Sequence, residues 1–186
     1  MSNITEHLND VNVPALKGYI GEITNKPESA KIDYKVNLEW QGGTKSKVTT
    51  KGITLGDQKL ERNFSFIVDE PPQLLGEDTN PTPQEYMLGG MGSCMIVGYA
   101  VGASVMGIKL EKLEIDIEAG LNLRGFLEVD PEAPIGFKNV KYTIRVKGDG
   151  TKEQFEKIHQ KVIDYSPNRA NISNAIEVIP DLIVEN

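Results

Sequence analysis

The longest stretch of the chain without a charged residue runs from Tyr86 to Ile108. Thr82, Pro83 and Glu85 stand just before it. This pattern favours a helix start, because threonine can cap, proline suits the first helical position and Glu85 can reach back to the cap. Apolar side chains beyond this start fall on every side of a helix, which is typical of a helix buried all round. We therefore expect a central core helix from Thr82 to Ile108.

Glycines recur along this expected helix. Each weakens a helix by about 1 kcal/mol relative to alanine. We expect them to admit another element close to the helix backbone. The glycines are Gly89, Gly90, Gly92, Gly98 and Gly102.

The same stretch also fits a membrane span, since it is long, uncharged and contains a Gly98-x-x-x-Gly102 pair. Against this, it lacks long runs of Leu, Ile and Phe, acidic residues flank it on one side only, and no other segment resembles a span or an aromatic belt. We predict a soluble core helix and no membrane partner.

Charge and cysteine content narrow the classes of function. The net charge of −7 argues against nucleic acid and against anionic membranes as partners. The polar, acidic start MSNITEHLND lacks the pattern of a signal or transit peptide. The single cysteine excludes an intrachain disulfide and a cysteine-rich metal site. These features predict a cytoplasmic protein.

Before the central helix, a short amphipathic helix is expected at 14–24, followed by strands at 31–40, 45–54 and 60–68. The first of these strands alternates apolar and polar residues and should be half-buried. Prolines and acidic residues make 69–81 a loop. We divide the chain into a tail with a short helix, residues 1–30, and a main domain, residues 31–186.

After the central helix, alternating residues predict strands at 113–124 and 140–147, with acidic and basic outer rows that can face each other. A capping box, Thr151 with Gln154, opens a helix that runs to about Tyr165. Residues 172–185 should close the fold as a strand. The order predicts an α+β protein with helices packed on antiparallel sheets.

Cys94, near the middle of the central helix, is the first candidate for chemistry. It can be a small core residue, as free cysteines often are, or a reactive thiol, which needs a cation or a helix N-terminus close by. The helix start lies about three turns away, so a cation must come from elsewhere. The candidates are Lys45, Lys47, Arg62 and Arg169.

The other candidates have ordinary structural interpretations. His159 invites a Cys–His hydrolase hypothesis but suits the flank of its helix, and His7 lies in the polar tail. Glu85 is the capping partner, with a catalytic carboxylate as the alternative. Two distant histidines do not make a metal site, and no glycine loop has phosphate-binding spacing. We expect no cofactor and no metal.

Between about Val36 and Val184 the chain resembles the OsmC/Ohr superfamily. The resemblance implies an α+β fold of antiparallel sheets around a buried central helix, in an obligate, intertwined homodimer. It rests on the segments VDEPPQLLGEDTNPTPQEYMLGGMGSC, LEKLEIDIEAGLNLRGFL and YSPNRANISNAIEV.

The resemblance also implies a chemistry. In the peroxidase members, a cysteine on the central helix attacks a hydroperoxide and becomes a sulfenic acid. A second cysteine, in a Cys-Pro step, then forms a disulfide with it, while an arginine and a glutamate hold the thiolate. Cys94 matches the first cysteine. Ser166-Pro167 stands where the second would be, so no internal disulfide can form.

The accessory residues also depart from the family pattern. The resemblance implies a glutamate ten residues before the first cysteine. That position is Gln84 here, and its neighbour Glu85 points about 100° further round a helix. Residues 31–54 contain no arginine; the nearest cations there are lysines, which lack the bidentate fork.

Two hypotheses therefore stay open. The first is a one-cysteine thiol peroxidase in which Cys94, with Glu85 in the site, reduces a hydroperoxide and an external thiol regenerates it. The second is a non-catalytic dimer that binds a small apolar molecule in its interface pocket.

Overall fold

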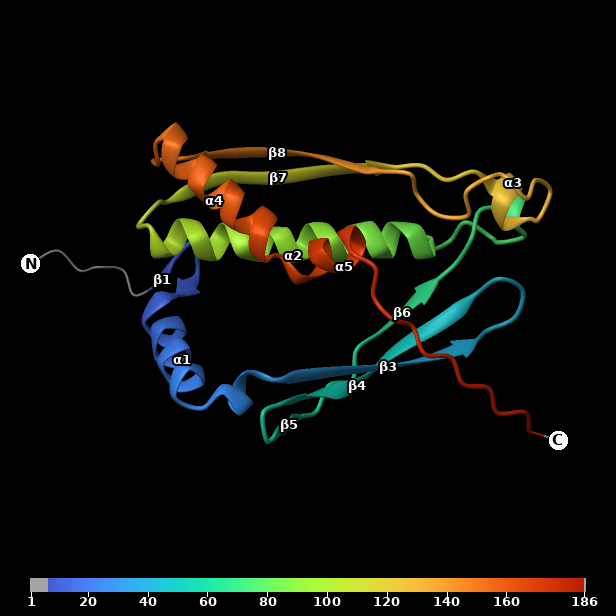
Figure 1. Ribbon diagram of the computed structural model, residues 1–186, viewed down its shortest axis with the longest axis horizontal. Helices are drawn as coiled ribbons and strands as arrows, with labels where there is room; N and C mark the ends of the chain where they lie inside the picture. The colour runs from blue at the N-terminus through green and yellow to red at the C-terminus, as the bar shows by residue number, and fades with distance from the viewer. Residues whose placement is uncertain (1–6, 186) are drawn as a thin grey trace, which may run out of the picture. The chain divides into compact units, whose positions relative to one another are not determined.

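The computed structural model describes residues 7–185. The chain forms two compact units, Met1–Gly89 and Gly90–Asn186, and the boundary falls inside the long helix α2 (Figure 1). The division at residue 31 stays a prediction.

The first unit begins with a small hairpin and a helix. Strands β1 (His7–Leu8) and β2 (Val11–Asn12) pair antiparallel. Helix α1 (Val13–Asn25) follows, and the Asn12 side chain accepts a hydrogen bond of 2.9 Å from the backbone N–H of Ala15. A short 3-10 turn, η1 (Pro27–Ala30), ends this region. The predicted helix at 14–24 is confirmed.

A four-stranded antiparallel sheet makes up most of this unit (Figure 1). Strand β4 (Ser46–Leu55) pairs with β3 (Ile32–Trp40), and both β5 (Gln58–Leu60) and β6 (Ser65–Val68) also pair with β4. Another 3-10 turn, η2 (Pro72–Leu74), lies in the loop that follows.

The third strand predicted at 60–68 is wrong as a single strand, because a bulge in β4 divides its pairing. The β3–β4 register shifts between Tyr34 and Val36, and Gly52 in the bulge has φ +86°. A Cβ atom at Gly52 would lie 2.9 Å from the Leu60 carbonyl oxygen, so glycine is needed there. A bulge bends its strand. Strand β6 pairs with the part of β4 before the bulge, and β5 pairs with the part after it.

The apolar face of β3 is exposed, contrary to the prediction of a half-buried strand. Tyr34 is 74% and Leu38 60% exposed. Among residues 7–89, the buried apolar side chains are Val48 and Val68. The sheet of the first unit therefore has very little core of its own, and large apolar surfaces of this kind mark interaction sites.

Helix α2 (Pro83–Val105) is continuous and reaches into the second unit. Two antiparallel strands, β7 (Leu110–Ala119) and β8 (Val140–Gly148), form that unit's sheet. Helices α3 (Leu123–Phe126), α4 (Lys152–Tyr165) and α5 (Pro167–Ser173) complete it. The predicted capping box of Thr151 and Gln154 opens α4 as expected.

Two strand predictions in this region are wrong. Strand β7 ends at Ala119 rather than 124, because Ala119 pairs with Val140, the first residue of β8, and Asn122 then caps α3. Residues 174–185 form neither helix nor strand. No described strand pairs with this segment, and its apolar side chains are exposed, Leu182 to 83%.

The core of the second unit is the contact of α2 with α4 and the β7–β8 sheet. Its buried residues are Met91, Met95, Tyr99, Ala103, Ile108, Ile158 and Val162. On the opposite side of α2, side chains are exposed in the described chain, Val97 to 62%. The prediction that α2 is buried all round is therefore wrong for the single chain. By length and composition alone α2 could also cross a membrane, and 33% of its apolar window is buried inside the structure.

The expected close packing at the α2 glycines is confirmed at three of them. A Cβ atom would lie 2.8 Å from Ile117 Cδ1 at Gly92, 3.0 Å from Val162 Cγ2 at Gly98, and 3.1 Å from Ile158 Cγ2 at Gly102. The close neighbours belong to β7 and α4 of the same chain.

The predicted charge rows of β7 and β8 also face each other. Asp116 pairs with Arg145, and Glu118 lies 3.7 Å from the Lys141 ammonium. Both pairs are solvent-exposed, so each contributes at most about 1 kcal/mol.

Candidate functional site

Cys94 lies on the part of α2 that packs in the second unit, and it is partly buried. Its neighbours Met91 and Met95 point into the core, with 2% and 0% of their surfaces exposed. Cys94 therefore lies at the border of the core rather than inside it.

Ser166 provides a polar contact to the Cys94 sulfur. Its Oγ lies 3.4 Å from Cys94 Sγ in hydrogen-bonding geometry, and Ser166 is only 6% exposed. Ser166 occupies the single position between α4 and α5. Its backbone N–H donates to the Val162 carbonyl over 3.1 Å, which fixes the end of α4.

Asn168 attaches the same segment to α2 at a second point. Its Nδ2 donates to the Gly90 carbonyl oxygen over 2.9 Å. In an α-helix this carbonyl also accepts the N–H four residues later, which is that of Cys94. Residues 166–168 therefore hold the turn of α2 that carries the thiol.

The start of α2 contributes little to the electrostatics of this thiol. The helix is unbroken from Pro83, so Cys94 lies about three turns from its N-terminus. The field of a helix end falls off within its first turn. Arg169, on α5, donates a hydrogen bond from its Nη1 to the Ile163 carbonyl over 2.9 Å. This bond directs the guanidinium to the end of α4.

The remaining candidate cations lie in the first unit. Lys45 forms an ion pair with Glu77, and the Arg62 guanidinium lies 5.0 Å from the centre of the Phe64 ring. Lys47 stands in β4, opposite Glu39 on β3. Two of these three cations therefore already have partners within their own unit.

Glu85 lies at the helix start, where its carboxylate accepts hydrogen bonds from the Thr82 backbone N–H over 2.7 Å and from the Thr82 hydroxyl over 3.0 Å. These two bonds lower the pKa of Glu85. The capping box is thus formed. On one continuous helix, nine residues turn the side chain by about 180°, so Glu85 and Cys94 project from opposite faces of α2.

His159 does not pair with the thiol among the described contacts. Its Nδ1 shares a hydrogen bond with the Tyr99 hydroxyl, and Tyr99 is 2% exposed. The Cys–His hydrolase arrangement is therefore not formed. Tyr99 was missed from the sequence because its position on the apolar helix indicates only a core residue. The other histidine, His7, is exposed in β1.

Residues 76–181 match the family model described as OsmC-like protein. The chain belongs to the OsmC-like protein family. The resemblance stated from the sequence, and the α+β fold it implies, are confirmed.

Two solved structures of OsmC-like proteins share this fold at low sequence identity. An OsmC-like protein of unknown function from Vibrio cholerae is 14% identical, with 81% of this chain and 99% of that chain covered and a TM-score of 0.57. An OsmC-like protein from Mycoplasma pneumoniae is 12% identical, with 77% and 87% covered and a TM-score of 0.56. An organic hydroperoxide resistance protein from Legionella pneumophila is 24% identical, with 75% and 89% covered and a TM-score of 0.47. No curated protein matches the sequence.

A second polar centre of this OsmC-like protein, also missed from the sequence, is the buried carboxylate of Asp69. It accepts hydrogen bonds from the backbone N–H groups of Glu70, Glu77 and Thr79 and from the Thr79 hydroxyl. Burial alone would raise the pKa of Asp69, but these bonds outweigh it and lower the pKa to about 2. The carboxylate therefore organises the loop that leads to α2.

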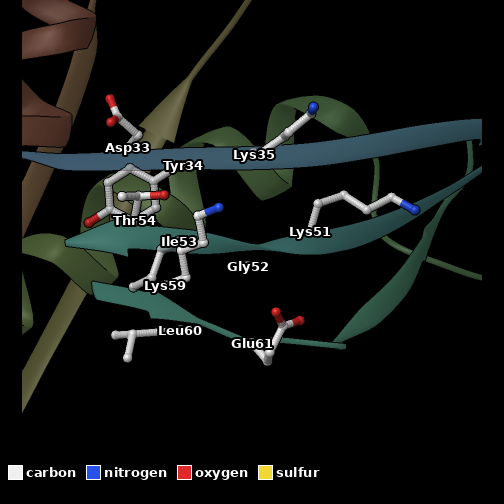
Figure 2. A pocket seen from close by; sticks show the side chains of 10 residues that line it. All are labelled: Asp33, Tyr34, Lys35, Lys51, Gly52, Ile53, Thr54, Lys59, Leu60 and Glu61. Atoms are coloured by element: carbon white, nitrogen blue, oxygen red, sulfur yellow. The ribbon is translucent and has the colours of Figure 1, made fainter. Parts of the chain in front are cut away.

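A hollow of about 380 Å³ lies on the sheet of the OsmC-like protein's first unit, across β3, β4 and β5 (Figure 2). Its lining mixes Lys35, Lys51 and Lys59 with Asp33 and Glu61, and includes neither Cys94 nor Glu85. Among residues 7–185, no group of three or more His, Cys, Asp or Glu side chains could hold a metal ion.

Proposed function

We propose that this OsmC-like protein is a thiol-dependent hydroperoxide reductase that acts through Cys94. The observation that carries the proposal is the contact of a partly buried Cys94 sulfur with the buried Ser166 hydroxyl at 3.4 Å. A sulfur next to a hydrogen-bond donor can be held as a thiolate, which is the nucleophilic form.

The reaction is a two-electron oxidation of sulfur. The Cys94 thiolate attacks one peroxide oxygen, the O–O bond breaks, and the leaving alkoxide takes a proton to become an alcohol. Cys94 retains one oxygen as a sulfenic acid. Because the chain has one cysteine, the return step needs an external thiol. One thiol condenses with the sulfenic acid and releases water, and a second thiol displaces Cys94 and leaves as a disulfide.

We infer that the functional unit is a homodimer. In support, one face of β3 exposes Tyr34, Leu38 and Trp40, and α2 exposes Val97. Isolated soluble chains rarely expose contiguous apolar surface of this extent. A second copy is the partner that the family resemblance implies, and sedimentation equilibrium of the purified protein tests it against a folded single copy.

The activity is tested by the rate at which the purified protein consumes tert-butyl hydroperoxide with dithiothreitol as the external thiol. The proposal predicts turnover by the wild-type protein and none by Cys94→Ser. Turnover retained in Cys94→Ser would overturn the mechanism. A folded wild-type dimer that consumes no hydroperoxide would instead favour the alternative, a non-catalytic dimer that binds a small apolar molecule.

A pair of variants tests whether the charge of Glu85 contributes to the reaction. Glutamine can replace glutamate in a capping box, so Glu85→Gln keeps the cap and removes the charge, whereas Glu85→Ala removes both. Equal loss of turnover in both variants assigns a role to the charge. Loss of thermal stability in Glu85→Ala alone, with turnover retained in Glu85→Gln, limits Glu85 to the helix start.

A further inference from the structure

Ser166 stands at a position where a serine side chain ordinarily caps a helix. It directly precedes Pro167, the first residue of α5, and its backbone is extended, with φ −76° and ψ 114°. A serine there typically accepts a hydrogen bond from a free N–H group of the first turn. The Ser166 side chain makes no such bond; its hydroxyl contacts Cys94 Sγ instead.

The direction of this hydrogen bond depends on the state of the sulfur. A thiol can donate or accept, but a thiolate has no proton and can only accept. When Cys94 is ionised, the hydroxyl of Ser166 must therefore be the donor. A hydrogen bond made to the charged form of a group favours that form.

We propose that Ser166 is a catalytic residue that donates a hydrogen bond to the Cys94 thiolate, and that Asn168 is a positioning residue that holds Ser166 against this turn of α2. The Asn168 bond to the Gly90 carbonyl lies two residues from Ser166 and four residues from Cys94. The catalytic role of Ser166 rests on the proposed hydroperoxide reductase function, whereas its hydrogen bond to Cys94 does not.

A hydroxyl at position 166 also affects the oxidised form of Cys94. Forming a disulfide with the sulfenic acid requires a second sulfur, which Ser166 does not supply. The oxidised protein therefore stays as a sulfenic acid at Cys94, hydrogen-bonded to Ser166, until an external thiol arrives.

The test is the rate of Cys94 alkylation by iodoacetamide as a function of pH, for the wild type and Ser166→Ala. A hydrogen bond to a charged group is strong enough to move the midpoint of this profile by about one pH unit. We expect an upward shift of that size. Alkylation below both midpoints then becomes about threefold slower, because the thiolate fraction falls about tenfold while the thiolate of higher pKa is about threefold more nucleophilic. An unchanged midpoint in folded Ser166→Ala overturns the proposal.

The matched control is Ser104→Ala. Like Ser166, Ser104 is a buried serine; it lies on α2, and its hydroxyl donates to the Ala100 carbonyl over 2.7 Å. The midpoint of Cys94 alkylation in Ser104→Ala should equal that of the wild type. The midpoint and the plateau rate at high pH together separate two effects. A lost hydrogen bond moves the midpoint and raises the plateau by about threefold, whereas looser packing around Cys94 raises the plateau and leaves the midpoint unchanged.

Asn168→Ala tests the positioning role. Its midpoint should shift upward by less than that of Ser166→Ala, and the double variant should shift no further than Ser166→Ala alone. A wild-type midpoint in Asn168→Ala, or additive shifts in the double variant, would remove Asn168 from the proposal.

The two measurements distinguish failure of the Ser166 hydrogen bond from failure of the proposed reductase function. If the wild type consumes no hydroperoxide but Ser166→Ala still shifts the alkylation midpoint, the hydrogen bond stands and the reductase function fails. If the wild type turns over and Ser166→Ala matches it in midpoint and rate, the role of Ser166 fails alone.

Discussion

Tyr99 on α2 and His159 on α4 share a hydrogen bond between the phenol hydroxyl and the imidazole Nδ1. Burial, with a smaller contribution from Tyr142 on β8, raises the pKa of Tyr99 far above its usual range. The phenol therefore keeps its proton, and its hydroxyl shares one hydrogen bond with the imidazole. This bond ties α4 to α2 in the same helix pair that brings Ser166 to Cys94.

Tyr99→Phe should lower the free energy of unfolding. The substitution removes the hydroxyl and leaves Nδ1 of His159 without this partner, at a cost of about 1–3 kcal/mol. Urea unfolding at neutral pH measures the change.

The matched control is Tyr165→Phe, since Tyr165 ends α4 with 81% of its surface exposed. It should unfold like the wild type. Equal stability of Tyr99→Phe and Tyr165→Phe would show that the Tyr99–His159 bond does not hold the helices.

Gly98→Ala should also destabilise the protein, although alanine favours a helix by about 1 kcal/mol. The new methyl group would stand 3.0 Å from Val162 Cγ2, and Val162 is a stiff, buried residue. Overpacking of a core costs about 1–3 kcal/mol, so we expect a net loss of about 1 kcal/mol in urea unfolding.

A double-mutant cycle with Val162→Ala identifies the cause. If the clash is responsible, Gly98→Ala should cost less, or become stabilising, in the Val162→Ala background. Additive effects of the two substitutions would place the cause elsewhere.

The Asp69 loop predicts an acid-sensitive contribution to stability. The pKa of Asp69 is about 2 in the folded chain, against an ordinary value of 3.8. A group whose pKa is lowered by folding stabilises the fold above the unfolded value and loses that contribution as the pH falls through the folded value. The stabilisation should thus be complete above pH 3.8 and disappear towards pH 2, as followed by thermal melts.

Asp69→Asn should unfold at a lower temperature than the wild type at neutral pH, and the difference should shrink as the pH falls from 3.8 towards 2. Asp78→Asn is the control, because Asp78 is exposed in the same loop and asparagine tolerates its φ of +54°. A difference between Asp69→Asn and wild type that is independent of pH would contradict this account.

Ser166→Cys should restore a disulfide, because Ser166 Oγ and Cys94 Sγ already lie within 3.4 Å. Peptide mass spectrometry after treatment with hydroperoxide should find residues 94 and 166 linked. Ser104→Cys places a thiol on α2, ten residues after Cys94, and should form no disulfide with it. Two free thiols in oxidised Ser166→Cys would contradict the alignment of Ser166 with the resolving position.

Local signals made several elements predictable from the sequence. The start of α2 depends on Thr82 and Glu85, which are three residues apart, and the start of α4 on Thr151 and Gln154. The alternation in β7 and β8 likewise fixes their pairing, with acidic residues opposite basic ones. Each of these features is decided by neighbours in the chain or by a strict period of two.

The misjudged elements depend on partners that local patterns do not contain. The alternation after Ala119 continues, yet the ladder stops where β8 begins at Val140. The face of β3 reads as half-buried, yet the single chain leaves it exposed. Within the site, Ser166 and Cys94 are 72 residues apart, and only the family resemblance drew attention to Ser166.

The central claim is that Cys94 is a reactive thiol, and trapping its sulfenic acid tests this most directly. The folded protein is treated with equimolar tert-butyl hydroperoxide in the presence of a cyclic 1,3-diketone, and the label is located by peptide mass spectrometry. The account predicts that Cys94 carries the diketone in the wild-type protein. An unlabelled Cys94 that is still a free thiol after this treatment, in protein that remains folded, would contradict it.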